Sequence, residues 1–143
     1  MGKLLGARKE AILLVKDEEG QVIEEYRALF TTRALADAEQ RIGKSMTQVL
    51  NGFVSGRSGV REIALLLQAG MEAERRASKS GGAPVSYGDA CDVIDLVGIN
   101  PAAESLNNAI VAVLSYGKSK PSSVDDDQGD EPKQPDEDTD PNA

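Results

Sequence analysis

Three aspartates spaced three residues apart, Asp89, Asp92 and Asp95, are the carboxylates best placed to act together in chemistry. A row of carboxylates on one side of a helix can hold a hard cation such as Ca²⁺. These aspartates fall opposite the apolar face expected for their helix, and no further oxygen ligands accompany them. Charged residues on the outer face of a helix are ordinary. We therefore expect a solvated helix face and no metal site.

Cys91 is the only cysteine of the chain, and a thiol can act as a nucleophile when a base activates it. The sequence has no histidine, which removes His-based triads and zinc sites that use histidine. Cys91 falls on an apolar stripe, so a small core residue is the favoured interpretation. A lone cysteine cannot form an internal disulfide, which fits a reducing compartment.

Gly52, Gly56 and Gly59 form a glycine-rich segment of the kind that can bind phosphate. Their spacing matches neither standard fingerprint, no Lys-Ser or Lys-Thr pair follows, and the segment joins two expected helices. We interpret residues 51–59, NGFVSGRSG, as a glycine- and serine-rich loop that acts as a hinge. No cofactor is expected, and without a nucleophile–base pair the chain is not expected to be an enzyme.

Residues 89–114, DACDVIDLVGINPAAESLNNAIVAVL, have the outline of a helix-turn-helix, which could bind DNA in the major groove. Their second helix offers Glu104, Asn107 and Asn108, and no arginine or lysine before Lys118. Non-specific DNA affinity comes mainly from basic side chains that neutralise phosphates. A plain helical hairpin is therefore favoured, and no nucleic acid partner is expected.

The middle of the chain is locally basic, and these residues could receive the acidic C-terminal tail or an acidic partner. They are Arg57, Arg61, Arg75, Arg76 and Lys79. The favoured interpretation is that they are solvated and interleaved with Glu62, Glu72 and Glu74 as exposed helix pairs.

Net charge divides the chain into two parts. Residues 118–143 carry nine acids, three lysines and four of the six prolines, for a net charge of −6 within a total of −8. Such a segment buries too little apolar surface to offset its ordering entropy. We expect a domain over residues 1–117 and a disordered acidic tail over residues 118–143. No signal peptide is recognised, and the apolar runs are too short to span a membrane. The expected protein is soluble and cytoplasmic.

The elements that would position these residues are a β-hairpin and about five short helices, a mainly α (α+β) fold packed as a compact bundle. Residues 11–15 and 21–30 predict two strands joined by a loop of about five residues. Helices are expected over 32–42 with Thr31 as N-cap, from Ser45 with Gln48 in a capping box, and over 59–77 with Ser58 as N-cap.

The last two helices follow a flexible linker at residues 78–84. Ser86 and Asp89 predict a capping box for a helix over 87–97, whose apolar side holds Tyr87, Ala90, Cys91 and Ile94. Asn100 is expected to cap the final helix, with Pro101 at its first position and Gly117 after its end. Its expected buried face consists of Leu106, Ala109, Ile110, Val113 and Leu114.

The helix over 59–77 is apolar on more than one side. Its main stripe consists of Val60, Ile63, Ala64, Leu67 and Met71. Leu65 and Leu66 lie off that stripe, so the helix must be covered on more than one side. Either it is central to the bundle, or part of it meets a partner.

Three segments resemble the tail assembly chaperones of long-tailed bacteriophages and related gene transfer agents. They are FTTRALADAEQRIGKSMTQVL, SGVREIALLLQAGM and SYGDACDVIDLVGINPAAESLNNAIVAVL. The family begins with a small β-element and a short helix led by phenylalanine, with a leucine and an acidic residue, here Phe30, Leu35 and Glu39. A glycine and a second short helix follow, here Gly43 and residues 46–50. The resemblance covers about residues 10–117 and does not extend to the acidic tail.

Two further features carry the resemblance. The family has a serine-capped, leucine-rich helix that ends in an alanine-glycine step, here Ser58, residues 65–67 and Ala69-Gly70. Its last helix pair turns on an isoleucine-aspartate-x-x-glycine step, here Ile94, Asp95 and Gly98.

The resemblance implies a protein of the host bacterial cytoplasm that is absent from the mature virion. Such proteins bind the tape measure protein, a very long helical chain, keep it soluble and help tail tube subunits assemble around it. In many phages a longer form arises by ribosomal frameshifting. A homo-oligomer is possible, and no membrane partner is implied.

A chaperone of this kind needs exposed apolar helix surface and solubility. Phe53, Leu65, Leu66 and Met71 are the residues expected to bind the partner, by analogy with helices bound in apolar grooves. The acidic tail would supply solubility by charge repulsion. The alternatives are a structural virion protein, such as a head–tail connector or tail completion subunit, and a small helix-turn-helix regulator.

Overall fold

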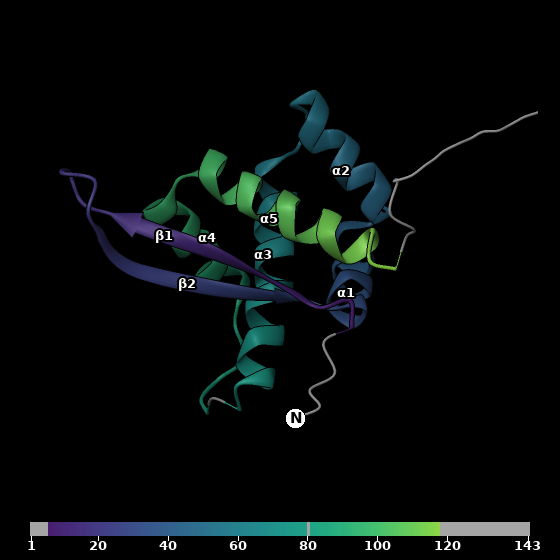
Figure 1. Ribbon diagram of the computed structural model, residues 1–143, viewed down its shortest axis with the longest axis horizontal. Coiled ribbons are helices and arrows are strands. Elements are labelled where there is room, and N and C mark those ends of the chain that lie inside the picture. Colours follow the sequence, from purple (N-terminus) through teal and green to yellow (C-terminus); the bar gives the residue numbers. More distant parts are fainter. Residues whose placement is uncertain (1–5, 80, 118–143) are drawn as a thin grey trace, which may run out of the picture.

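The computed structural model describes residues 6–79 and 81–117, which form a two-stranded sheet and five helices (Figure 1). The predicted α+β fold class is confirmed. The elements are β1 (Lys9–Lys16), β2 (Val22–Phe30), α1 (Thr32–Ile42), α2 (Met46–Ser55), α3 (Val60–Ala77), α4 (Tyr87–Val97) and α5 (Ile99–Leu114). The predicted disorder of residues 118–143 lies outside the described residues.

The hairpin is antiparallel, with Leu13 opposite Tyr26, and its loop has the predicted length. Asp17 organises the loop, because its Oδ1 accepts hydrogen bonds from the backbone nitrogens of Glu19 and Gln21, both at 2.9 Å. Gly20 has φ +82°, a conformation that favours glycine. One face of β1, formed by Ala11, Leu13 and Val15, is buried. β2 packs mainly on α3 and β1 mainly on α5.

The caps of α1 and α2 match the predictions. Thr31 Oγ1 accepts a hydrogen bond from Ala34 N at 3.1 Å, and Gly43 ends α1 with φ +82°. Ser45 and Gln48 form the predicted capping box at the start of α2. A hydrogen bond that was not predicted joins the two helices: Glu39 Oε2 accepts it from Met46 N at 2.7 Å.

Two predictions about the segment between α2 and α3 are wrong. α2, whose apolar side was expected to include Phe53, runs to Ser55, so the loop is shorter than residues 51–59. Gly59, not Ser58, is the N-cap of α3, and no side chain caps the helix. The buried Oγ of Ser58 has no hydrogen-bond partner among the described residues.

The start of α5 also differs from the expectation. Gly98, with φ +100°, is its N-cap, and Asn100 lies inside the first turn. Glycine lets α4 turn directly into α5 through one residue. Pro101 is tolerated in that turn because the first amides of a helix need no intrahelical partner. At the other end, Leu114 is exposed, which corrects its expected place on the buried face.

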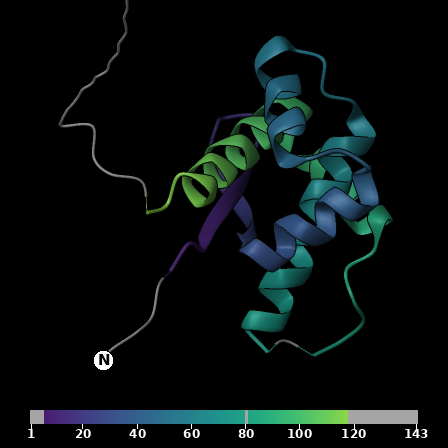
Figure 2. The ribbon, with the colours of Figure 1, turned by 90° about the vertical axis from the view of Figure 1, so that its right-hand side faces the viewer.

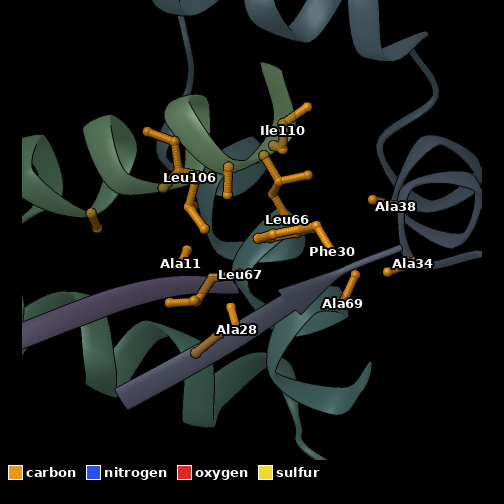
Figure 3. Close-up of a cluster of buried hydrophobic side chains, with 14 of the residues drawn as sticks. Ala11, Ala28, Phe30, Ala34, Ala38, Leu66, Leu67, Ala69, Leu106 and Ile110 are labelled. Atoms are coloured by element: carbon orange, nitrogen blue, oxygen red, sulfur yellow. The ribbon is translucent and has the colours of Figure 1, made fainter. Parts of the chain in front are cut away.

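α3 is the central helix, and the hairpin crosses it while α5 lies along the hairpin (Figure 1). Figure 3 shows Phe30 in the middle of the buried cluster, with Leu66 and Ile110 near its ring. The approach of β2 to α3 is close at Gly70. A Cβ placed on Gly70 would lie 2.6 Å from Phe30 Cζ and 2.8 Å from Ala28 Cβ. Both views place α2 at one end of the molecule (Figure 2).

Candidate functional site

Leu65 and Leu66 do not supply the exposed apolar surface that was expected of them. They are 6% and 0% exposed, because α3 is covered by the hairpin, α1, α4 and α5. Of the two interpretations of this helix, the central position in the bundle is the one observed. Conversely, Val60 was expected in the buried stripe and is 63% exposed.

Phe53 lies in an apolar groove between the end of α2, the start of α3 and the first half of α5. We call it the α2–α5 groove; its volume is about 510 Å³. Its apolar lining consists of Phe53, Val54, Val60, Ile63, Ile99 and Ala103. Val54 is 85% exposed, the largest value among the exposed large apolar residues of the described chain. Asn100, Glu104 and Asn107 add a polar side.

The groove exists because of how α2 is held. Met46 and Val49, in the first half of α2, are its buried residues. Gly56, with φ +73°, ends the helix, and its turn leads into α3. The second half of α2 therefore projects over α5 with its apolar side half covered. The sequence indicated Phe53 as a partner-binding residue but not Val54 or Ile99. The apolar pair at residues 53–54, ahead of Gly56 and Gly59, would have indicated Val54 as well.

Met71 lies at a different place from Phe53. It lines a shallow depression of about 310 Å³ with Tyr26, Val93 and Leu96, and Asp89 and Asp92 also line it. The expected partner-binding residues thus do not form one surface. Phe53 and Met71 are each half-buried in separate depressions, and the two leucines are internal.

The residues considered for metal or thiol chemistry lie on α4. Asp89, Asp92 and Asp95 are all exposed. Within residues 6–79 and 81–117, no three potential metal ligands of the His, Cys, Asp or Glu type cluster together. Cys91 is half-buried beside the core, while Tyr87, expected on the same apolar side, is 40% exposed.

A second groove is lined by arginines, and we call it the arginine groove. It has a volume of about 440 Å³ between α1, the C-terminal half of α3 and the loop before α4. Its charged residues are Arg8, Arg33, Asp37, Arg41, Glu72, Arg75 and Arg76. Of the basic residues singled out from the sequence, Arg57, Arg61 and Lys79 lie outside it. The spacing of Arg33, Asp37 and Arg41 on α1 was the overlooked signal.

Glu72 organises one wall of the arginine groove. Its Oε1 accepts hydrogen bonds from Val85 N at 2.8 Å and Arg75 Nε at 3.0 Å, while Oε2 accepts from Arg75 Nη2 at 2.7 Å and Arg76 Nε at 3.0 Å. The hydrogen bonds from Arg75, with that from Val85, lower the pKa of Glu72 to about 2 despite partial burial. The hydrogen bond from its backbone nitrogen ties Val85, the residue after the linker predicted over residues 78–84, to α3.

Glu72→Gln is expected to reduce the free energy of unfolding by roughly 1.5 kcal/mol near pH 7, as for hydrogen bonds to a charged group. Because the folded pKa lies below the unfolded one, the carboxylate stabilises the fold above the unfolded value of 4.5, and this contribution is lost as the pH falls toward about 2. The difference between wild type and variant should therefore shrink over that window. Urea unfolding at several pH values measures it.

Glu104→Gln is the matched control, since Glu104 is exposed on α5 and makes no ion pair within the described residues. It should change stability by less than about 0.5 kcal/mol. A difference for Glu72→Gln that stayed constant with pH would contradict the role assigned to the ionised carboxylate.

Comparison of the chain with known protein families, with curated proteins and with solved structures finds no match in any of the three. Within the described residues, none of the helices is both long and apolar enough to cross a membrane. The candidate sites are two exposed grooves of the described residues, one apolar and one rich in arginine.

Proposed function

We propose that the chain is a tail assembly chaperone of a long-tailed bacteriophage or gene transfer agent, which binds the tape measure protein and keeps it soluble. The observation that carries the proposal is the exposed apolar α2–α5 groove. Val54 and Val60 are 85% and 63% exposed in a groove of about 510 Å³ that also contains half-buried Phe53. Contiguous exposed apolar surface commonly marks an interaction site.

The proposed client segment is an amphipathic helix of the tape measure protein, which would lay its apolar side into the groove. The polar side formed by Asn100, Glu104 and Asn107 suits the polar flank of such a helix. The resemblance of residues 30–50, 58–71 and 86–114 to the chaperone family supports this choice of partner. Binding of this kind requires no nucleophile and no cofactor. The net charge of −6 in residues 118–143 would oppose self-association.

Co-expression with the tape measure protein encoded in the same phage or element tests the proposal. We expect the client, insoluble alone, to become soluble in a complex whose stoichiometry is read by size exclusion with light scattering. An insoluble client beside a folded free chain would overturn the proposal. A structural virion protein would then be the better interpretation, and the chain should be found in purified particles.

Val54→Glu with Val60→Glu tests the groove itself. Both side chains are largely exposed, so the fold should be unchanged, while burying a charge in place of each valine should weaken client binding by roughly tenfold to hundredfold. The readout is the client's soluble fraction, with circular dichroism to verify folding.

The matched control is Val22→Glu with Ile23→Glu on the hairpin, where the side chains are 52% and 63% exposed. It introduces the same charges on another exposed apolar surface and should leave client rescue intact. Equal rescue by the groove variant and by the hairpin variant would remove the α2–α5 groove as the binding site.

A further inference from the structure

The arginine groove carries an excess of positive charge on a chain that is acidic as a whole. Five arginines and two carboxylates line it, for a net charge of +3, against −8 for the chain. Arg75 and Arg76 are engaged with Glu72. Arg8, Arg33 and Arg41 make no ion pair within 4.0 Å among the described residues. Three guanidinium groups therefore border the groove outside any ion pair of the described residues, and Asp37, one turn from Arg33 and Arg41 on α1, is the carboxylate of the groove nearest to them along that helix.

We infer that the arginine groove binds the acidic C-terminal tail of the same chain, through carboxylates between Asp125 and Asp140. This inference is independent of the client, because the α2–α5 groove shares no residue with the arginine groove. The tail is the strongest negative segment of the chain, with nine acids and three lysines in residues 118–143. Arginine is the side chain best suited to carboxylates, because its planar donors can bind two oxygens at once.

The tail is long enough to reach the groove. Its 26 residues can span at most roughly 85 Å, while a domain of this size has a radius of gyration of about 13 Å. α5, after which the tail begins, ends on the side of the molecule where α1 lies (Figures 1 and 2). A tether of this length gives the tail an effective concentration on the order of a millimolar, so weak contacts suffice.

The negative net charge of the chain also argues against a nucleic acid as the occupant of the arginine groove. A polyanion approaching the groove would meet the repulsion of a chain with net charge −8 and would have to displace the tethered tail. The contacts of the tail would be exposed ion pairs, each of about 0.2–1 kcal/mol and screened by salt. Occupancy by the tail should therefore fall steeply as ionic strength rises.

Paramagnetic broadening in the full chain tests the inference. A nitroxide at Ser123→Cys, in a chain carrying Cys91→Ala so that the label site is unique, should broaden amide signals of Arg33, Arg41 and Arg76. We expect at least roughly a twofold loss of intensity at about 50 mM salt and recovery near 0.5 M, where the Debye length is only a few ångströms. Amides at Phe53 and Asn107, which line the other groove, should be unaffected.

Arg33→Glu with Arg41→Glu should abolish the broadening, while Arg57→Glu with Arg61→Glu, the same charge change outside the groove, should preserve it. Broadening that survives Arg33→Glu with Arg41→Glu, or that is even over the whole domain, would overturn the inference. A mixture of isotope-labelled chain without nitroxide and unlabelled chain with nitroxide should show no broadening. Broadening in that mixture would assign the tail to a second copy and overturn binding within one chain.

Discussion

Phe30→Ala is expected to lower the free energy of unfolding by about 4 kcal/mol, the middle of the range for removing a buried aromatic ring. Phe30 is fully buried at the end of β2 and lies in the centre of the core cluster (Figure 3). Among the aromatic residues of the described chain, Phe30 is the one that is fully buried, since Phe53 and Tyr26 are half-buried and Tyr87 and Tyr116 are exposed. A loss of this size is a large share of the 5–15 kcal/mol typical of a domain.

Phe53→Ala is the matched control, because it removes the same ring from the half-buried wall of the α2–α5 groove. It should cost roughly half as much or less, since less apolar surface is lost from the interior. Urea unfolding followed by circular dichroism measures both variants. Where Phe30→Ala does not fold, Phe30→Leu, expected to cost about 1–2 kcal/mol, takes its place. Equal costs at the two positions would contradict the central place of Phe30.

The two phenylalanines also separate stability from function. Under the proposed function, Phe53→Ala should weaken client rescue more than it weakens the fold. Phe30→Leu should do the reverse, since Phe30 does not line the α2–α5 groove. This crossed result distinguishes loss of a binding surface from general destabilisation.

Local features of this fold could be predicted from the sequence because each is encoded within a few residues. The Thr31 cap, the Ser45–Gln48 box and the Ser86–Asp89 box each join residues three positions apart. The hairpin loop is likewise set by Asp17 and Gly20. Such contacts need no knowledge of tertiary packing.

The candidate sites could not be predicted in the same way, because exposure depends on which helix is central. Leu65, which lies off the predicted apolar stripe of α3, is buried, while Val60, which lies on that stripe, is exposed. Which side of α3 is buried depends on the four other elements that pack on it, β2, α1, α4 and α5. Arg8, Arg33 and Arg75 line the arginine groove from separate parts of the chain. Their spacing in the sequence does not indicate that they lie at one site.

Gly70→Ala is the second large effect, with an expected loss of about 2–3 kcal/mol. The added Cβ would lie 2.6 Å from Phe30 Cζ and 2.8 Å from Ala28 Cβ, far below the roughly 3.5–4.0 Å of a favourable carbon contact. Because Ala28 Cβ is fixed to the backbone of β2, the strand itself must move away from α3. Overpacking of this kind outweighs the gain of up to about 1 kcal/mol in helix propensity.

Gly88→Ala is the control that isolates this clash. Gly88 is exposed in α4, and an added Cβ there would meet only Ser86 Oγ, at 3.7 Å. The same substitution should therefore stabilise the chain by about 0.5–1 kcal/mol through helix propensity alone. Urea unfolding of the two variants should give shifts of opposite sign.

A double-mutant cycle of Gly70→Ala with Phe30→Leu shows whether the ring is the obstacle. Leucine removes the far end of the ring, which supplies two of the three closest atoms, while Ala28 remains. Gly70→Ala should then cost about 1 kcal/mol less in the Phe30→Leu chain than in wild type, a coupling typical of residues in contact. Strict additivity would mean that α3 and β2 separate without pressing on Phe30, and the close approach at Gly70 would then depend on Ala28 alone.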